Sequence, residues 1–301
     1  MGTSSTTTKE KTRTYQLKHS HFSTLFKREE NKFKLEKKQF DDIHQQLEDY
    51  NFTETWEVFF EVLSKEKKLT WLDLDGNEIG DLYSLEKVKI KRLSEFISPS
   101  ISLSWLDLSN NNIEDNGVKL LSQSLVVNNS IKVILLNKNR ITSMGMYYLT
   151  ESLKFNSSIT KIHISYNNIC DEGLSYLQSM LQVNSTITHI SIKSNIFTMV
   201  GIEKITEILP FSSITWMDIS ENKLGLSELA LFGEASHSSK LNVKINLKTI
   251  KVEKDELFDY FDQTQFLNVY YFNSHGCEIG FKKRFTTASV FNRKIDKEFI
   301  L

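Results

Sequence analysis

The chain has 301 residues, of which 40% are hydrophobic and 25% are charged, a composition typical of a soluble globular protein. Its formal net charge of −1 argues against a general nucleic-acid-binding protein, which would carry a strongly basic domain. Cys170 and Cys277 are its only cysteines, so neither a disulfide framework nor a cysteine zinc site is present, and no metal or cofactor is predicted. Because no apolar run is long enough to span a membrane and no apolar signal core opens the chain, we expect a cytoplasmic protein.

Residues 1–40 are predicted to form a flexible tail that is polar and basic. The first half is rich in serine and threonine and nearly free of aliphatic residues, which is a disordered composition. Met1-Gly2-Thr3-Ser4-Ser5-Thr6 fits the N-myristoylation pattern, and several lysines and one arginine follow. A myristoyl chain on Gly2 together with these cations would hold the protein at the inner face of a membrane. An unmodified tail is the alternative.

Residues 41–68 are predicted to form a helical cap at the N-terminal end of the fold. Trp56, Phe59 and Leu63 fall at helical spacing, at the same offsets as the helical core residues of the repeats that follow. The preceding segment around Asp41 and His44 does not match the strand half of a repeat. A capping helix is therefore expected, because an open apolar end would aggregate.

Residues 69–248 contain a repeated pattern, L-x-x-L-x-L-x-x-N-x-L. One copy begins at Leu69, and five further copies follow at steps of 28 residues, or 27 in the last case, starting at Leu103, Ile131, Ile159, Ile187 and Ile214. Within a unit, alternating apolar residues predict a short strand, and later apolar residues at helical spacing predict a helix. One such unit cannot bury its apolar face alone, so the units must stack into a continuous core.

This pattern resembles the leucine-rich repeat, and its 28-residue period resembles the ribonuclease-inhibitor-like subtype, as in NOD-like receptors and Ran GTPase-activating proteins. The resemblance covers about residues 52–248. It implies an α/β fold: a curved solenoid, or horseshoe, with parallel β-strands on the concave face and helices on the convex face. It also implies protein–protein interaction as the function.

An asparagine recurs in all six units, and a glycine recurs in four of them. An asparagine stands where the strand ends, where its amide can pair with backbone groups that would otherwise be buried without partners; these residues are Asn77, Asn111, Asn139, Asn167, Asn195 and Asn222. A glycine follows in four units, and we expect it just before the helix, where the chain turns tightly; these residues are Gly117, Gly145, Gly173 and Gly201.

The strand residues that point away from the core are predicted to line a partner-binding surface. Large aromatic side chains are enriched in binding hot spots, and zones of opposite charge orient a partner. The candidate residues are Trp71, Asp73, Trp105, Asp107, Lys138, Lys161, His163, Tyr166, His189, Lys193, Trp216 and Asp218. The alternative is that Trp71 and Trp105 stack on each other and cover the sheet, while the charged residues only keep the surface soluble.

Residues 249–301 are predicted to form either a C-terminal cap of the solenoid or a separate small α/β segment. They are aromatic enough to pack, and two β-prone runs flank Asn273-Ser274-His275-Gly276, a hairpin turn. Just before this segment, Val243, Ile245 and Leu247 alternate as in a further strand.

The sequence contains none of the phosphate-binding, serine-hydrolase or zinc-protease motifs, so no catalytic residues are predicted. We expect a non-catalytic adaptor or scaffold that binds an unidentified protein on the concave face, and no nucleic acid. The alternative is a GTPase-activating protein that resembles the Ran GTPase activators.

Overall fold

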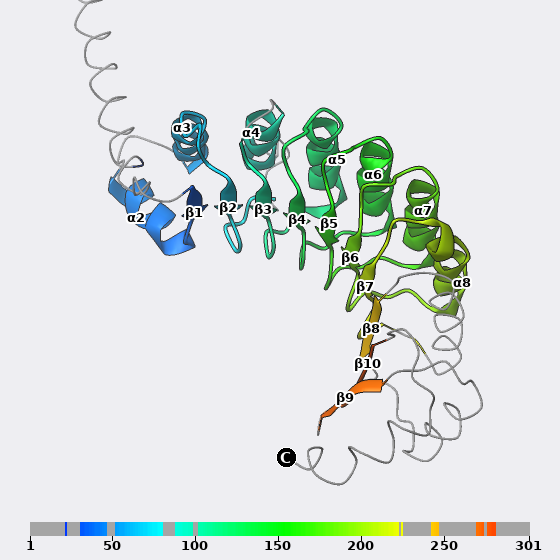
Figure 1. Cartoon of the computed structure of the whole chain (residues 1–301). Coiled ribbons are helices and arrows are strands. Elements are labelled where there is room, and N and C mark those ends of the chain that lie inside the picture. Colours follow the sequence, from blue (N-terminus) through cyan, green and yellow to red (C-terminus); the bar gives the residue numbers. More distant parts are fainter. Residues whose placement is uncertain are drawn as a thin grey trace, which may run out of the picture.

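The computed structural model describes residues 22, 31–46, 52–80, 88–98, 102–222 and 224, and the backbone of three further strands at 242–246, 269–273 and 276–280. The described strands form one ten-stranded sheet in the order β1-β2-β3-β4-β5-β6-β7-β8-β10-β9. Figure 1 shows the units following one another along an arc, with the strands on its inner side and the helices on its outer side. The predicted α/β solenoid, with strands on the concave face and helices on the convex face, is confirmed.

The regular strands are three residues long: β1 (Lys32–Lys34), β2 (Trp71–Asp73), β3 (Trp105–Asp107), β4 (Val133–Leu135), β5 (Lys161–His163), β6 (His189–Ser191) and β7 (Trp216–Asp218). The helices are α2 (Lys37–Gln46), α3 (Phe52–Leu63), α4 (Val88–Ile97), α5 (Glu114–Leu125), α6 (Ser143–Leu153), α7 (Asp171–Leu181) and α8 (Met199–Ile208), and a 3-10 turn, η1, covers Leu209–Phe211.

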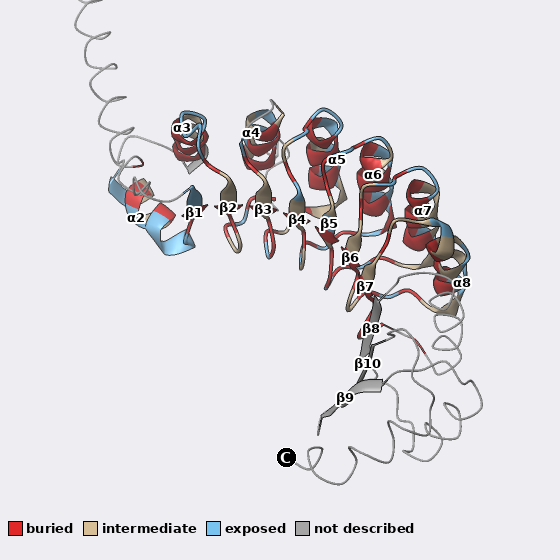
Figure 2. Ribbon diagram, in the orientation of Figure 1, coloured by how far each residue is buried: buried red, intermediate tan, exposed pale blue. Residues whose placement is uncertain are grey.

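The core lies between the sheet and the row of helices. In each strand the central residue, such as Ile134, Ile162 or Ile190, is buried, while its two neighbours face the inner side of the arc. The helices bury residues at steps of three and four, for example Leu174, Leu177 and Leu181 in α7. Figure 2 shows the buried residues filling this layer along the described solenoid.

The asparagines form a chain of hydrogen bonds beneath the turns. The Oδ1 atom of Asn139 accepts hydrogen bonds from the backbone N–H groups of Asn111 and Ile113, at 2.9 and 3.3 Å. Its Nδ2 atom donates to the carbonyl oxygens of Leu108 and Asn137, at 2.7 and 3.1 Å. Each asparagine therefore satisfies backbone groups of its own unit and of the preceding one, where the chain leaves the strand and no ladder partner remains.

The recurring glycines do not lie where we expected them. They are not before the helices but inside the first turns of α5, α6, α7 and α8, and none of the four has a positive φ. A Cβ on Gly145 would stand 2.5 Å from Oδ1 of Asp115, and a Cβ on Gly201 would stand 2.7 Å from Oδ1 of Asp171. These two glycines are thus required for the close approach of a neighbouring unit rather than for backbone freedom.

Each of the two carboxylates at these glycines binds the start of the next helix: Asp115 of α5 binds the start of α6, and Asp171 of α7 binds the start of α8. Oδ1 of Asp171 accepts hydrogen bonds from the backbone N–H groups of Thr198 and Gly201, at 2.7 and 3.0 Å, and Asp115 does the same for Thr142 and Gly145. Each carboxylate therefore satisfies N–H groups at a helix N-terminus that lack partners within the helix, and its negative charge suits that end of the helix dipole.

The N-terminal unit differs from the predicted tail and cap. Strand β1 and the start of α2 lie within residues 1–40, which were predicted to be flexible, and β1 pairs in parallel with β2, Phe33 opposite Leu72. The reason is tertiary: Phe33 and Leu35 are buried at the end of the sheet, although lysines surround them in the sequence. Two helices, α2 and α3, complete this unit.

An aromatic cluster fills the interior of the N-terminal unit. The rings of Phe40 and Trp56 stack with centroids 4.1 Å apart, and Phe59 meets Trp56 edge-on at 5.4 Å. Phe22 and Phe60 complete the packing, and all five residues are buried. The cluster lies at the N-terminal end of the core, and Trp56, Phe59 and Leu63 are all buried there.

Three strands extend the sheet at the C-terminal end. β8 (Asn242–Asn246) pairs in parallel with β7, β10 (Gly276–Gly280) pairs antiparallel with β8, and β9 (Val269–Asn273) pairs antiparallel with β10. The two strands on either side of the predicted hairpin turn therefore pair with each other, and the turn residues 274–275 lie outside the described residues. The pairing of β10 with β8 continues the sheet of the solenoid.

Candidate partner-binding face

The predicted binding residues of the strands lie in two rows on the inner face of the arc. The parallel register aligns Trp71, Trp105, Val133, Lys161, His189 and Trp216 in the first row. The same register aligns Asp73, Asp107, Leu135, His163, Ser191 and Asp218 in the second row. Since adjacent strands are about 4.8 Å apart, the face extends for roughly 24 Å from β2 to β7.

At the N-terminal end of this face, Trp71 and Trp105 stack on each other. Their ring centroids are 4.5 Å apart and the planes differ by 14°, and both side chains remain partly exposed. The stacking proposed as the alternative interpretation is therefore present. Because both residues keep part of their surface exposed, the stack does not by itself remove the two rings from a binding surface.

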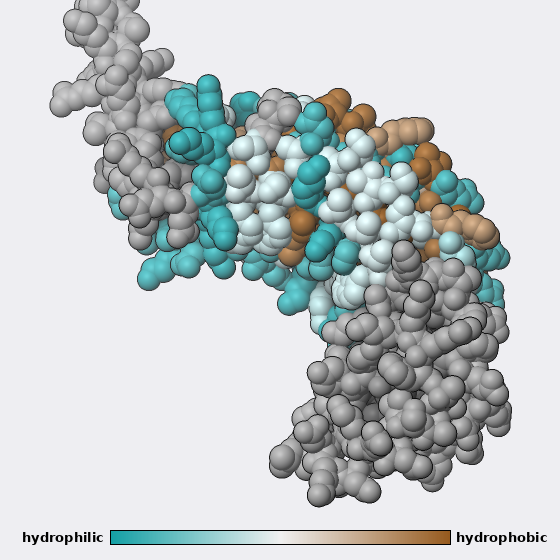
Figure 3. All heavy atoms as spheres, viewed as in Figure 1, coloured by the Kyte–Doolittle hydropathy of each residue, from teal (hydrophilic) through white to brown (hydrophobic). Residues whose placement is uncertain are grey.

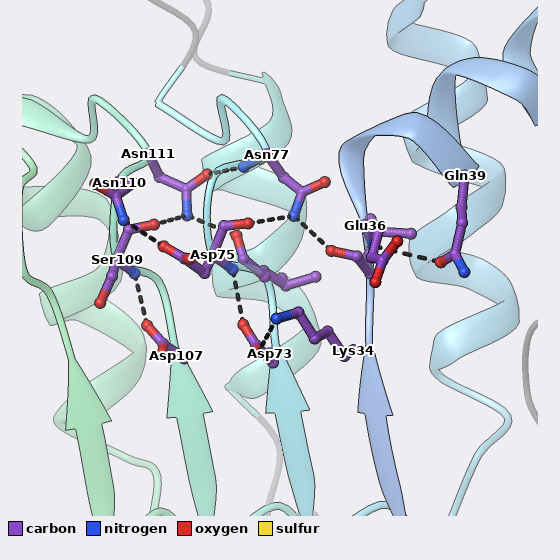
Figure 4. A network of polar contacts seen from close by, with 12 residues as sticks. Lys34, Glu36, Gln39, Asp73, Asp75, Asn77, Asp107, Ser109, Asn110 and Asn111 are labelled. Atoms are coloured by element: carbon purple, nitrogen blue, oxygen red, sulfur yellow. Dashed lines mark hydrogen bonds and ion pairs between the residues drawn. The ribbon is translucent and has the colours of Figure 1, made fainter.

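The aspartates of the second row bind their own turns. Oδ1 of Asp107 accepts a hydrogen bond from the backbone N–H of Ser109 at 2.8 Å, and Asp73 and Asp218 accept equivalent bonds from residues two positions on. Figure 4 shows this arrangement for Asp73 and Asp107, with Lys34 reaching Asp73 at 3.5 Å. Because Asp73 and Asp218 are buried, they offer little surface to a partner, which was not foreseen in the sequence.

Asp107 is the more accessible aspartate of the N-terminal pair. Burial raises the pKa of its carboxyl group, and the nearby carboxylates Asp73 and Asp75 act in the same direction, while the hydrogen bonds from Ser109 oppose the rise. This end of the face is thus acidic and crowded with like charges.

The middle of the face is basic and centres on Tyr166. The Nζ atoms of Lys138 and Lys193 lie 5.4 and 5.5 Å from the centre of its ring. Glu221 binds Lys193 at 3.1 Å and accepts a hydrogen bond from the Tyr166 hydroxyl at 3.3 Å. Lys138, Tyr166 and Glu221 each stand one residue before a ladder asparagine and have a positive φ, which directs this row of side chains along the rim of the sheet.

At the C-terminal end of the face, two histidines surround Trp216. The imidazole of His189 stacks on the indole ring with centroids 6.0 Å apart, and that of His163 lies at 6.2 Å. Burial lowers the pKa of His163, and the positive charge of Lys161 adds to this effect, while Asp218 opposes it. Burial and Lys161 also lower the pKa of His189.

These histidines make the stability of the fold depend on pH. Because their folded-state pKa values lie below the ordinary value of 6.5, the unfolded chain binds more protons as the pH falls through 6.5. We therefore expect the free energy of unfolding to decrease on acidification in this range, and the His163→Gln variant to show a weaker decrease. Urea unfolding in a series of buffers from neutral to mildly acidic pH measures this, and an unchanged slope in the variant would contradict the assignment.

Apolar side chains also reach the surface outside the predicted site. Figure 3 shows apolar residues gathered over the outer helices toward the C-terminal half of the described solenoid, while the N-terminal units are mostly hydrophilic. Of the described residues, Phe155 and Phe211 are 85% and 84% exposed. The sequence analysis did not identify these two residues. They are two repeat periods apart, so aligning the residues that follow each predicted helix would have found them.

Within the described residues no group of three or more histidine, cysteine, aspartate or glutamate side chains is arranged to hold a metal ion. None of the described helices has the length and apolar character needed to cross a bilayer.

Two segments of the chain, residues 100–122 and 155–177, match a family model described as Leucine Rich repeat. A comparison with curated proteins found no match. Among solved structures, leiomodin-1 actin-binding site 2 is similar at 16% identity and a TM-score of 0.41, over 52% of this chain and 89% of that one. An internalin, InlF from Listeria monocytogenes, is similar at 16% identity and a TM-score of 0.35, over 65% and 63%. Both matched segments lie within the repeated part of the chain, and the parallel sheet with its outer helices is the α/β solenoid that the repeated pattern predicts.

Proposed function

We propose that this chain is a non-catalytic protein–protein interaction module, an adaptor or scaffold, that binds a partner protein on its concave face. The observation that supports this most is the inner wall itself, on which the Trp71–Trp105 stack and the Trp216 cluster flank a basic middle. Tryptophan, tyrosine and arginine dominate binding hot spots, because large rigid rings bury much area at low entropic cost.

The distribution of charge gives this face a direction. The N-terminal end carries the carboxylates around Asp107, and the middle carries Lys138 and Lys161. Such an arrangement orients a partner and speeds its encounter more than it adds affinity. A partner with a basic and an acidic region, placed along the strand ladder in that order, would match it.

The test is a pull-down from native extract with the full chain as bait. We expect the Trp71→Ala/Trp105→Ala variant to bind a specific partner about thirtyfold more weakly than the natural chain, since loss of a hot spot costs at least ~2 kcal/mol. The Phe155→Ala/Phe211→Ala variant is the matched control, because it also removes two aromatic rings, but from outside the strands. Equal retention by all three proteins, with unchanged far-UV circular dichroism, would rule out this face.

Three finer proposals rest on the sequence alone. The 28-residue step favours the ribonuclease-inhibitor-like subtype. Gly2, which lies outside the described residues, is the proposed site of a myristoyl group, and the intact mass of the protein from its own cells tests it. GTPase activation is the alternative function; a scaffold would leave single-turnover GTP hydrolysis by small GTPases unchanged.

A further inference from the structure

Four apolar residues form a row along one edge of the solenoid. Val127, Phe155, Val183 and Phe211 are spaced by 28 residues and are 59%, 85%, 51% and 84% exposed. Each lies just after a helix, at or near the start of the turn that leads to the next strand. Because strands β4 to β7 pair in register, these turns fall at the same edge, where the strands begin.

The fold does not need these side chains. The turn after α6 is held by Asn156, whose Oδ1 atom accepts hydrogen bonds from the N–H groups of Ser158 and Ile159, at 3.0 and 2.9 Å. Its Nδ2 atom donates to the carbonyl of Leu125 at 2.8 Å, and Asn128 and Asn184 hold their turns in the same way. Val127, Phe155 and Val183 each stand beside one of these asparagines, and Phe211 stands beside Ser212, whose hydroxyl donates to the carbonyl of Leu209 at 2.9 Å. The four apolar side chains are exposed to solvent, where large apolar side chains are usually avoided.

The same edge is basic. The fully described turns at 64–70, 126–132, 154–160, 182–188 and 209–215 contain five lysines and one glutamate. The lysines are Lys65, Lys67, Lys68, Lys132 and Lys154, of which Lys65 and Lys154 pair with Glu61 and Glu151 of the preceding helices, at 3.4 and 2.6 Å. The four turns of the apolar row themselves contain Lys132 and Lys154 and no acidic residue. At the opposite edge, the non-helical residues 74–80, 108–113, 136–142, 164–170, 192–198 and 219–222 contain three acidic and three basic side chains. Among the described turns, those on the apolar edge therefore have a net positive charge, and those on the opposite edge are neutral.

We propose that the edge carrying Val127, Phe155, Val183 and Phe211 rests on an anionic lipid membrane. Turns that follow one another along an arc present their tips to one plane, so a flat surface can meet all four together. Neighbouring helices are about 8–10 Å apart, so the tips are isolated from one another. A lipid interface accommodates each tip separately, whereas a folded partner needs a contiguous patch of about 800 Å². The lysines match the negative surface of such a membrane, and apolar insertion and charge together set the strength of peripheral binding.

This orientation leaves the inner face of the arc open, and it does not require a lipid on Gly2. Binding through the edge and binding through the strands are separate properties, and a different pair of aromatic residues reports on each.

The test is co-sedimentation of the full-length, unlipidated protein with vesicles of phosphatidylcholine, with and without phosphatidylserine. We expect binding that requires phosphatidylserine, and an apparent partition coefficient at least about tenfold lower for Phe155→Ser/Phe211→Ser, since burying even one phenylalanine contributes that much. Met144→Ser/Val200→Ser is the matched control, because these two residues are 45% and 56% exposed in the first turns of α6 and α8, near the opposite edge. The control and the Trp71→Ala/Trp105→Ala variant are expected to bind vesicles like the natural chain.

Four results would overturn the proposal. The first is that the natural chain does not sediment with either kind of vesicle, and the second is that its binding does not depend on phosphatidylserine. The third is that Phe155→Ser/Phe211→Ser binds vesicles as well as the natural chain does. The fourth is that Met144→Ser/Val200→Ser loses as much vesicle binding as Phe155→Ser/Phe211→Ser. If the natural chain does not bind vesicles, sedimentation velocity shows whether it forms a dimer. A dimer that is lost in Phe155→Ser/Phe211→Ser would instead assign the edge to contact with a second copy of the chain.

Discussion

Replacing Trp56 with alanine is expected to lower the free energy of unfolding by about 3–5 kcal/mol, the usual cost of removing a large aromatic residue from a core. The ring is 1% exposed, stacks on Phe40 and meets Phe59 and Phe60. Its loss leaves a cavity at the end of the solenoid, where only one neighbouring unit can relax to fill it. Urea unfolding followed by far-UV circular dichroism measures the effect.

Trp71→Ala is the matched control for this experiment. Trp71 is partly exposed and its main contact is the stack with Trp105, so its removal should cost only about 0.5–1.5 kcal/mol. If both variants lost the same stability, the aromatic cluster would not be the element that closes the N-terminal end of the core.

Replacing Asn139 with alanine is expected to cost about 3 kcal/mol. The change leaves the N–H groups of Asn111 and Ile113 and the carbonyl groups of Leu108 and Asn137 without the amide that pairs with them. Each buried polar group that loses its partner costs about 1–3 kcal/mol, and small movements that admit water will recover part of the total. Chemical denaturation is again the measurement.

Asn168→Ala provides the comparison, since Asn168 is an exposed asparagine beside the next ladder position. A change within about 0.5 kcal/mol is expected there, as for most surface substitutions. Comparable losses at Asn139 and Asn168 would show that the ladder contributes little beyond helix and strand packing.

The repeats could be predicted because one pattern recurs six times, and each copy predicts the same strand, turn and helix. Strand β1 could not be predicted in this way. It lies 39 residues before its partner in β2 rather than 28, and it offers a single apolar residue, Phe33, between two lysines. Its burial is determined by the open end of the sheet, a tertiary effect that no local pattern records.

The candidate site was predicted in outline but not in its contacts. Alternation placed Trp71 and Trp105 on the inner face, because a strand has a period of two. The cluster of Lys138, Tyr166, Lys193 and Glu221 depends on left-handed turns in successive units, which spacing alone does not reveal. The hydrogen bonds of Asp73 and Asp107 follow a side-chain turn motif that is visible in the sequence, since Asp two residues before the end of a turn commonly accepts such a bond.

The asparagine ladder has a direction, which makes the two ends of the array inequivalent. Each amide oxygen accepts from the unit before it, so at the N-terminal end the buried Oδ1 of Asn77 has no donor among the described residues. Shortening the array from its C-terminal side would instead leave a backbone donor without an acceptor. The N–H of Asn195 is an example, because Oδ1 of Asn222 is its acceptor. A carbonyl-type oxygen tolerates such a loss better than an N–H does, so an open end of the ladder costs less at its N-terminal end than at its C-terminal end.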